Sequence, residues 1–162
     1  LVKYADGPTT EVDILITAPI ERVWELVSDI ELPARFSSEF LGARWLEGER
    51  RVGARFAGRN HHDAIGDWET VSFVTRYEPP RSFAWAVTDP ISPSASWWFD
   101  LHEEAGGTRL RQGMRMGPAR SGLSAAIEAM PDKEERIVAR RLSEHERNMR
   151  ANLEGIKQLA EQ

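Results

Sequence analysis

The chain has 162 residues, of which 41% are hydrophobic and 29% charged, and its formal net charge is −5. This length suits a single domain, residues 1–162, and the balance of 21 basic and 26 acidic residues gives no sign of nucleic-acid binding. The chain contains no cysteine, which excludes disulfides, thiolate metal sites and a cysteine nucleophile. No apolar run reaches the roughly 18 residues of a membrane span, and the N-terminus has no basic segment followed by an apolar one, so we expect a cytoplasmic protein.

The first predicted elements are a strand and two short helices. The run of apolar, branched residues at 11–16 ends at Thr17-Ala18-Pro19 and predicts a strand. Pro19 suits the first turn of a helix, and the apolar positions after it recur at helical spacing. These positions are Ile20, Val23, Trp24 and Val27. A second short helix is predicted over residues 33–40.

From Leu41 to Met116 the pattern changes to short apolar runs separated by turn residues, which is typical of strands. The predicted strands cover residues 43–47, 51–60, 67–77, 82–88, 96–102 and 108–116. The strand at 67–77 is apolar on both faces, so its orientation stays open, and a bulge would switch it. The short connections, such as the turn at Ala105-Gly106-Gly107, favour an antiparallel meander.

The C-terminal part is helical. A short helix is predicted over residues 121–130, ended by Pro131, and a long amphipathic helix follows from Asp132 to Gln162. Its inward stripe contains Val138, Leu142, His145, Met149, Asn152, Ile156 and Leu159. We therefore expect an α+β fold, in which a curved seven-stranded antiparallel sheet wraps around the long C-terminal helix, with two short helices after the first strand. A sheet of this curvature does not close onto one helix everywhere, which favours a cavity between them.

Several segments between residues 11 and 160 resemble one fold superfamily. They are Ala18-Pro19-Ile20-Glu21-Arg22-Val23-Trp24, Gly58-Arg59-Asn60, Gly66-Asp67-Trp68, Tyr77-Glu78-Pro79-Pro80-Arg81-Ser82-Phe83-Ala84-Trp85 and Gly107-Thr108-Arg109-Leu110. In order and spacing the chain resembles the START-like helix-grip superfamily, also called SRPBCC, and within it the polyketide cyclase/dehydrase and lipid-transport family. The resemblance implies a deep hydrophobic pocket under the C-terminal helix, but no single activity. The chain departs from many of these relatives at Phe36, where they carry tryptophan.

Six tryptophans stand beside only two tyrosines, and strand alternation places several large apolar side chains on the inward face. We expect the pocket to be lined by Trp68, Trp85, Trp97, Phe83, Phe99, Met114, Met116 and Met149. Apolar walls with a few polar groups are typical of small-molecule sites, although the same rings also serve as plain core packing. Trp98 is predicted on the outer face, either exposed at a homodimer contact or covered by the short helices.

Three polar residues are candidates for ligand contact or catalysis. His145 lies on the inward stripe of the long helix, as an acid, a base or a hydrogen-bond donor, or as a satisfied core histidine. Asn60 shares the inward parity of Phe56 and either orients a bound polar group or caps the neighbouring hairpin. Gln112 points inward from the last strand. These residues form no convincing acid–base pair, so whether the protein is an enzyme stays open.

The sequence contains no motif of a phosphate-binding loop, a nucleophile elbow or a zinc protease, and we expect no cofactor. His61-His62-Asp63 is the one cluster with the chemistry of a metal site. Adjacent strand residues point to opposite faces, so two neighbouring histidines rarely share one ion. The run also precedes a turn at Ala64-Ile65-Gly66, and we expect a solvated loop with no metal.

These observations favour a protein that binds a hydrophobic small molecule, such as a lipid, polyketide, quinone or aromatic metabolite, between the sheet and the long helix. One alternative is an enzyme of the polyketide cyclase, aromatase or dehydratase type, in which His145, Asn60 or Gln112 moves protons or holds an enolate. Another is a protein-interaction role, as a co-chaperone or ribosome-associated factor, through an exposed patch at Trp98.

Overall fold

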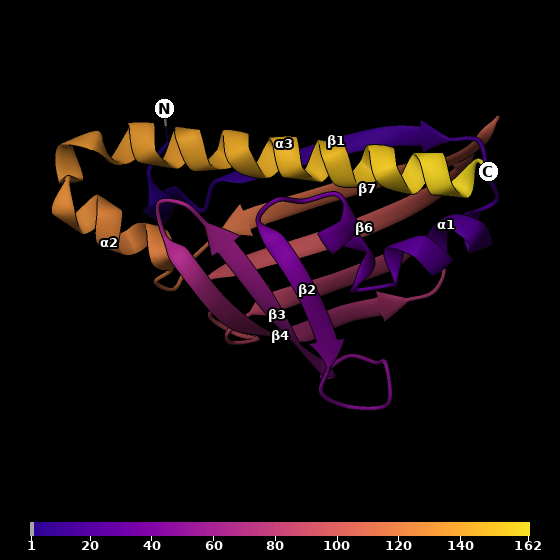
Figure 1. Ribbon diagram of the computed structural model, residues 1–162, viewed down its shortest axis with the longest axis horizontal. Helices are drawn as coiled ribbons and strands as arrows, with labels where there is room; N and C mark the ends of the chain where they lie inside the picture. Colours follow the sequence, from indigo (N-terminus) through magenta and orange to yellow (C-terminus); the bar gives the residue numbers. More distant parts are fainter. Residues whose placement is uncertain (1) are drawn as a thin grey trace.

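The computed structural model describes residues 2–162, which form one sheet with a long helix along it (Figure 1). The strands are β1 (Thr9–Ile16), β2 (Phe40–Trp45), β3 (Arg55–His62), β4 (Gly66–Glu78), β5 (Ser82–Val87), β6 (Ala95–Glu104) and β7 (Gly107–Met116). The α-helices are α1 (Ile20–Val27), α2 (Gly122–Ala129) and α3 (Glu134–Ala160), and the 3-10 turns are η1 (Tyr4–Asp6), η2 (Leu32–Arg35) and η3 (Pro131–Lys133).

The seven strands form a single sheet in the order β1-β7-β6-β5-β4-β3-β2, and every neighbouring pair is antiparallel. Strands β2 to β7 therefore make a meander, whereas β1 pairs with the last strand. α1 and η2 occupy the connection between β1 and β2, and α3 packs against β1 and β7. The expected α+β fold, a seven-stranded antiparallel sheet on a long C-terminal helix, is confirmed.

The second short helix is a single turn, shorter than the predicted range of 33–40. η2 ends at Arg35, and two residues later the Ser37 hydroxyl accepts hydrogen bonds from the backbone N–H groups of Glu39 and Phe40, at 3.1 and 3.0 Å. A side chain that satisfies these amides offers the backbone an alternative to the helix. The chain therefore turns, and Phe40 begins β2 instead of ending a helix.

The first predicted loop of the meander is longer than expected. β3 begins at Arg55, because residues 46–54 form a loop that is closed by the hydrogen bond from the Leu46 N–H to the Arg55 carbonyl at 2.9 Å. At its other end β3 continues through His61 and His62. The predicted loop at His61-His62-Asp63 is therefore wrong for both histidines, which pair with β4 across the hairpin.

A bulge in β4 decides which face each of its side chains takes. Ser72 and Val74 are both buried on the inner face, and the register against β5 then shifts between Val74 and Arg76. After this shift Tyr77 points inward, and its ring lies 5.6 Å from that of Trp24 between centroids. The bulge thus settles the orientation that the sequence leaves open.

The hydrophobic core fills most of the space between the sheet and the helices. It includes Val12, Ile16, Val23, Trp24, Phe83, Phe99, Leu101, Leu110, Met114, Val138, Met149, Leu153 and Ile156. Complete burial of one large apolar side chain contributes roughly 1.5–3 kcal/mol relative to exposure. Phe83 of β5, Phe99 of β6 and Met114 of β7, which were predicted to face inward, all lie in this core.

The C-terminal half of α3 sits very close to the segment that follows η2. A Cβ atom at Gly155 would lie 2.5 Å from the ring of Phe36, nearer than atoms approach without repulsion. Two residues along, the Lys157 ammonium donates to the Leu15 carbonyl at 2.9 Å. These contacts fix α3 against both β1 and the turn that precedes β2.

Trp98 lies on the outer face of the sheet, half-buried. A Cβ at Gly113 would lie 2.4 Å from its indole, and its Nε1 donates to the Glu11 carboxylate at 3.0 Å. The ring is thus packed by the sheet itself, which neither predicted environment described.

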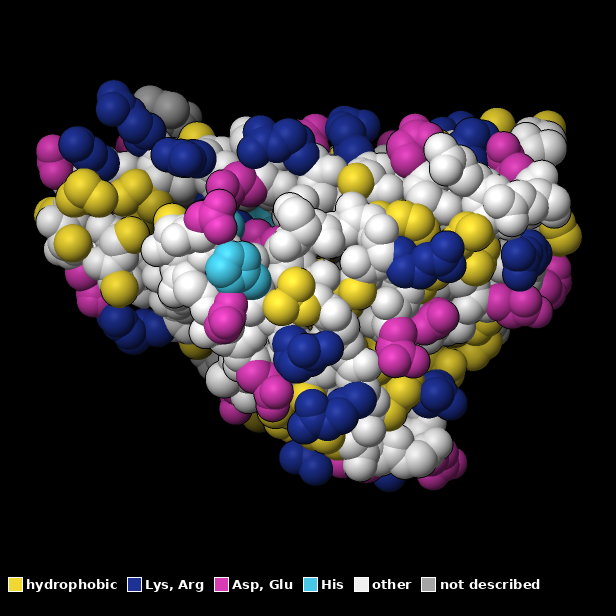
Figure 2. Space-filling model, viewed as in Figure 1, with side chains coloured by type: hydrophobic (Ala, Val, Ile, Leu, Met, Phe, Trp, Pro, Cys, Tyr) yellow, Lys and Arg dark blue, Asp and Glu magenta, His cyan; other side chains and the backbone are white. Residues whose placement is uncertain are grey.

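Within residues 2–162 no helix has the length and apolarity to span a membrane, and charged side chains line the outer surface of α3 (Figure 2).

Candidate functional site

A cavity of about 180 Å³ lies between the inner face of the sheet and α3. Its walls come from the segment after α1, from strands β2 to β7, and from the middle of α3. Among the residues predicted to contact a ligand or to act in catalysis, those that line it are Asn60, Phe83, Trp85, Trp97, Phe99, Gln112, His145 and Met149. The sequence pattern thus predicted much of the lining.

Three residues of the predicted set do not line the cavity. Met114 and Met116 follow Gln112 along β7, but both are buried in the hydrophobic core. Trp68 pairs with Asn60 across β3 and β4 and is half-buried outside the cavity. Alternation gave these residues the correct face of the sheet, but not their position along it.

The sheet side of the cavity is dominated by aromatic rings from β3, β5 and β6. The ring of Trp85 is central, at centroid distances of 5.6 Å from Phe56, 5.1 Å from Phe83 and 5.9 Å from Phe99. Contacts of this kind hold rings rigidly in edge-on and tilted arrangements. Phe56 was not among the expected ligand contacts, but its shared parity with Asn60 was the signal that would have added it.

The helix side of the cavity carries a row of polar side chains. His145, Asn148 and Asn152 follow one another at helical spacing and face the same wall. The Asn152 Nδ2 group donates to Gln112 Oε1 at 3.1 Å, while the buried Oδ1 atom of Asn152 has no partner within residues 2–162. Asn148 and Asn152 were missed as site residues, and their spacing from His145 was the signal that would have found them.

His145 faces the cavity with its ring edge-on to Trp97, at a centroid distance of 5.1 Å. Burial, together with the nearby positive charge of Arg141, lowers the pKa of His145 to about 3. The ring is therefore neutral at pH 7. Within residues 2–162 no side chain or backbone group forms a hydrogen bond with the ring, whose aromatic contact is Trp97.

Asn60 completes the polar part of the lining on the sheet side, together with Thr70 and Ser72 from β4. None of these three side chains has a hydrogen-bond partner in the described part of the chain. Asn60 therefore does not cap its hairpin through its side chain, which was one of the two predicted roles. All three polar groups are instead directed to the cavity.

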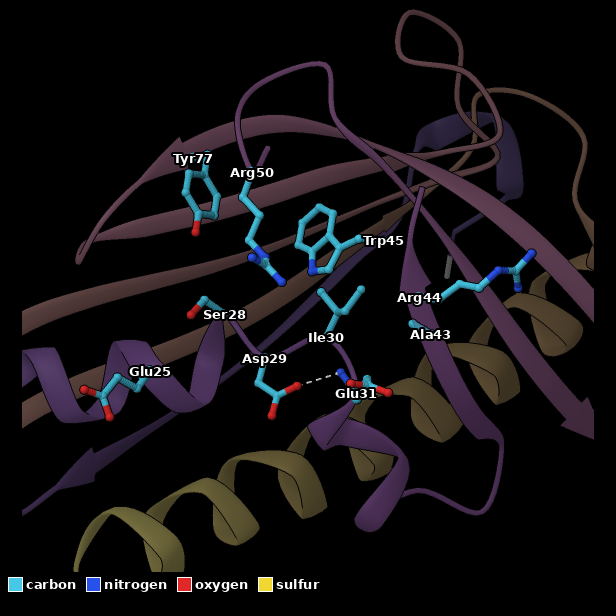
Figure 3. A pocket seen from close by; sticks show the side chains of 10 residues that line it. All are labelled: Glu25, Ser28, Asp29, Ile30, Glu31, Ala43, Arg44, Trp45, Arg50 and Tyr77. Atoms are coloured by element: carbon cyan, nitrogen blue, oxygen red, sulfur yellow. Dashed lines mark hydrogen bonds between the residues drawn. The ribbon is translucent and has the colours of Figure 1, made fainter. Parts of the chain in front are cut away.

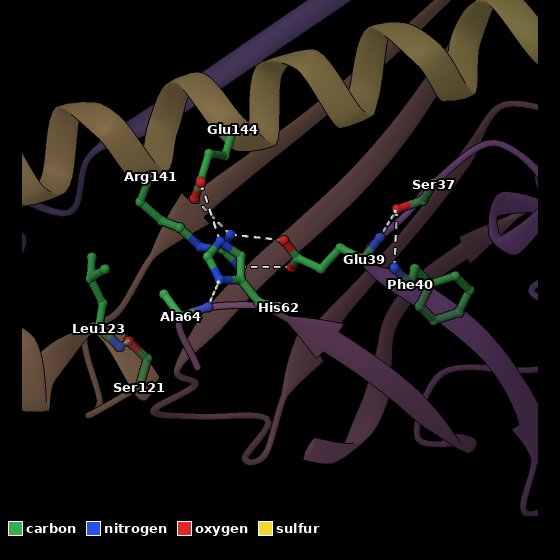
Figure 4. Close-up of polar contacts among 9 residues, drawn as sticks. All are labelled: Ser37, Glu39, Phe40, His62, Ala64, Ser121, Leu123, Arg141 and Glu144. Carbon is green, nitrogen blue, oxygen red and sulfur yellow. Dashed lines mark hydrogen bonds and ion pairs between the residues drawn. The ribbon is translucent and has the colours of Figure 1, made fainter. Parts of the chain in front are cut away.

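Glu39 of the cavity lining belongs to a cluster of charged residues, the Arg141 cluster, formed by Arg141, Glu39, Glu144 and His62 (Figure 4). Arg141 donates to both oxygens of Glu39 at 2.8 and 2.7 Å and to Glu144 at 3.0 Å, and His62 Nε2 lies 3.2 Å from Glu144. Arg141 is only 11% exposed and Glu39 15%. The cluster ties α3 to the start of β2 and the end of β3.

The charges of the Arg141 cluster stabilise one another. Burial alone would lower the pKa of Arg141, but the carboxylates of Glu39 and Glu144 reverse this and raise it. Burial alone would raise the pKa of Glu144, but hydrogen bonds from His62 and Arg141 lower it. The Ala64 N–H donates to His62 Nδ1 at 3.0 Å, so the proton of this histidine sits on Nε2, facing Glu144.

Next to the cavity an open groove of about 510 Å³ lies between the end of α1, β2 and the loop that follows it (Figure 3). Asp29 and Ile30 line both the groove and the cavity and so form the wall between them. The Arg50 guanidinium lies over the ring of Trp45, 5.1 Å from its centroid. The groove therefore shares two of its lining residues with the cavity.

The two neighbouring histidines of β3 point to different partners. His61 contacts Asp67 and Asp63, and these two carboxylates raise its pKa. His62 instead joins Glu144 of α3. In the described residues, 2–162, no group of three His, Asp or Glu side chains is placed to hold a metal ion.

The cavity under a long helix on a curved antiparallel sheet defines a helix-grip protein. Residues 8–161 match the family described as polyketide cyclase / dehydrase and lipid transport. The chain therefore belongs to this family, a member of the SRPBCC superfamily, and the resemblance drawn from the sequence is confirmed. No match was found among curated proteins.

Solved structures of similar fold agree with this assignment. The polyketide-cyclase-like protein Cgl2372 of Corynebacterium glutamicum is 33% identical, with a TM-score of 0.66 over 93% of this chain and 90% of that one. The di-domain aromatase/cyclase BexL from the BE-7585A biosynthetic pathway is 16% identical, with a TM-score of 0.74 over 96% of this chain and 50% of that one. Ara h 8.0201 is 12% identical, with a TM-score of 0.60 over 94% of this chain and 97% of that one.

Proposed function

We propose that the protein binds a hydrophobic small molecule in the cavity between the sheet and α3. The observation that carries this proposal is the lining of the cavity, in which aromatic rings from three strands face a row of polar side chains on α3, among them Asn152 with its unpartnered Oδ1 atom. An apolar pocket with a few convergent polar groups is the usual form of a small-molecule site. Membership of a family described by cyclases and lipid transport supports the same conclusion.

Catalysis of the cyclase or dehydratase type in the same cavity is the second candidate, favoured by the position of His145 beside the polar row. A general base works best when its pKa lies near the working pH. The pKa of His145 is about 3, so it accepts a proton only weakly at pH 7. Binding without proton transfer is therefore the function that this site supports better.

Saturable binding of iodobenzene tests the proposal, because this probe is uncharged and its iodine quenches tryptophan fluorescence on contact. We expect quenching that saturates, through Trp85 and Trp97 in the cavity walls. Gly58→Leu is expected to abolish the saturable part. The added side chain would start in the cavity, where a Cβ meets its nearest atoms at an ordinary 3.4 Å.

Gly48→Leu is the matched control, since a Cβ at Gly48 meets nothing within 4 Å and the residue is exposed. This variant should keep the wild-type titration curve. A crystal of the complex would place the iodine by its anomalous signal. Quenching that stays linear in wild type, or that saturates equally in Gly58→Leu, would refute binding in this cavity.

A further inference from the structure

A buried amide pair, Asn152–Gln112, joins α3 to β7 at the cavity. Asn152 is 5% exposed and Gln112 7%, and the hydrogen bond between them uses one group from each side chain. Asn152 Oδ1 is left as a buried acceptor without a protein partner, and Gln112 Nε2 as a donor that makes no hydrogen bond within residues 2–162. Both residues line the cavity, so the pair places an unused acceptor and an unused donor beside it.

A hydroxyl group is a small neutral group that fits such a pair. It donates one hydrogen bond and accepts others, so it satisfies Asn152 Oδ1 and Gln112 Nε2 together. A buried acceptor without a partner is costly, and in the free protein solvent is the group that would fill this need. A ligand that lacked a hydroxyl would remove this solvent without replacing its hydrogen bonds.

The charges around the cavity act against an anionic ligand. The charged side chains of its lining are Asp29 and Glu39, both acidic, and the lining includes no lysine or arginine. The nearest guanidinium, that of Arg141, is already held by Glu39 and Glu144. A carboxylate moved from water to this place would lose its hydration without gaining a counter-ion.

The volume of the cavity limits the ligand to a small ring system. A dry apolar cavity of about 150 Å³ accommodates benzene, and the cavity here is about 180 Å³. One substituted ring therefore fits between the aromatic wall and the helix. A long acyl chain does not fit inside it.

We infer that the ligand is an uncharged aromatic molecule with a single substituted ring, whose hydroxyl group is held by the Asn152–Gln112 pair. This inference rests on the proposed function and adds the chemical class of the ligand. It makes Asn152 and Gln112 the residues that determine specificity, while the aromatic rings of the sheet supply affinity for any apolar molecule of the right size.

Three probes that share a ring and an iodine test the inference, namely 4-iodophenol, iodobenzene and 4-iodobenzoate, each titrated at pH 7 by tryptophan quenching and calorimetry. We expect 4-iodophenol to bind at least about tenfold more tightly than iodobenzene, as expected for a hydroxyl that completes a buried hydrogen-bonding site. We expect 4-iodobenzoate to bind most weakly of the three.

The double variant Asn152→Leu with Gln112→Leu should bind iodobenzene and 4-iodophenol with equal affinity. Replacing both partners of a buried hydrogen bond by apolar groups is close to neutral for stability, and thermal unfolding confirms that the variant is folded. Should the double variant fail to fold, Asn152→Leu alone should reduce the preference for 4-iodophenol, since it removes the acceptor and leaves only the Gln112 amide. Gln158→Leu is the matched control, because Gln158 is an exposed amide on the same helix outside the cavity lining and should leave the preference for 4-iodophenol unchanged.

The outcomes separate this inference from the proposed function. If iodobenzene saturates but 4-iodophenol binds no more tightly, the cavity binds apolar molecules and the role of the amide pair is overturned. Preference for 4-iodophenol that survives the double variant, or tightest binding by 4-iodobenzoate, also overturns it. If none of the three probes saturates, the proposed function falls and the inference falls with it.

Discussion

His145 shows how strongly the surroundings of one residue decide its chemistry. The same imidazole that titrates near neutral pH in water faces aromatic rings here, and it has no hydrogen-bonded carboxylate to stabilise its charged form. Its place on an inward helical stripe was predictable from spacing. Its protonation state was not, because that depends on the rings and charges which tertiary structure brings around it.

The buried His145 should make the protein less stable at acid pH. Its pKa is about 3 in the folded protein against an ordinary 6.5, so between these values the unfolded chain binds a proton that the folded protein does not. Its stabilising contribution is complete above pH 6.5 and falls as the pH falls toward 3, by at most about 1.4 kcal/mol per pH unit. Urea unfolding of His145→Asn from pH 4 to 8 should show a flatter acid side than wild type.

His61→Asn is the control for this measurement because the pKa of His61 is shifted in the opposite direction, raised by Asp67 and Asp63. The contribution of His61 is complete below its ordinary pKa and is lost as the pH rises through the raised value. This variant should therefore keep the acid decline of the wild type. An equally steep acid decline in His145→Asn would mean that His145 is not the group responsible.

Arg141→Met should lower the free energy of unfolding by about 2–4 kcal/mol, because it leaves Glu39 charged, mostly buried and without its partner. Arg150→Met provides the comparison on the same helix. Arg150 pairs with Glu146 at 2.9 Å, but the two side chains are 59% and 42% exposed, so its loss should cost less than about 1 kcal/mol. Equal urea midpoints for the two variants would contradict the structural role of the Arg141 cluster.

At the scale of elements, Gly155 is an exception to the rule that glycine weakens the interior of a helix. Replacing glycine by alanine inside a helix ordinarily stabilises it by about 1 kcal/mol. At this position the new methyl group would overlap the ring of Phe36, and overpacking of this kind costs about 1–3 kcal/mol. We expect Gly155→Ala to lower the thermal midpoint, whereas Ser143→Ala, at an exposed site of the same helix, should leave it unchanged or raise it slightly.

The elements themselves were predictable wherever one hydrophobic period ran unbroken. Alternation in β5, β6 and β7 and the helical stripe of α3 gave their type and inward face, because these elements bury one continuous side. The prediction failed where a single side chain redirects the backbone, as Ser37 does at the start of β2. It also left β4 undecided, since a bulge has no clear hydrophobic signature.

At the scale of the whole molecule, the sequence predicted a cavity but neither its volume nor the polar contacts beside it. The volume is what remains after the rings of β3, β5 and β6 have packed against one another, and such packing cannot be deduced from alternation. The Asn152–Gln112 bond joins residues 40 positions apart on different elements. The Arg141 cluster likewise joins α3 to residues near two strand ends, which no local pattern connects.

The pairing of the first strand with the last imposes an order in time on the folding of the sheet. Ile16 pairs with Thr108 and Thr9 with Arg115, whereas the strands from β2 to β7 meet their neighbours through short turns. Local hairpins lose little chain entropy when they close, but docking of β1 requires most of the chain to be held in a single loop. We therefore expect the meander to form first and β1 to join after the rate-limiting step.

Stopped-flow kinetics of two buried-residue variants would reveal this order. Val12→Ala in β1 should accelerate unfolding and leave the refolding rate nearly unchanged, whereas Leu110→Ala in the β6–β7 hairpin should slow refolding. Equal slowing of refolding by both variants would mean that β1 is already docked in the transition state. With the expected result, β1, the first strand in the chain, is the last strand to join the sheet.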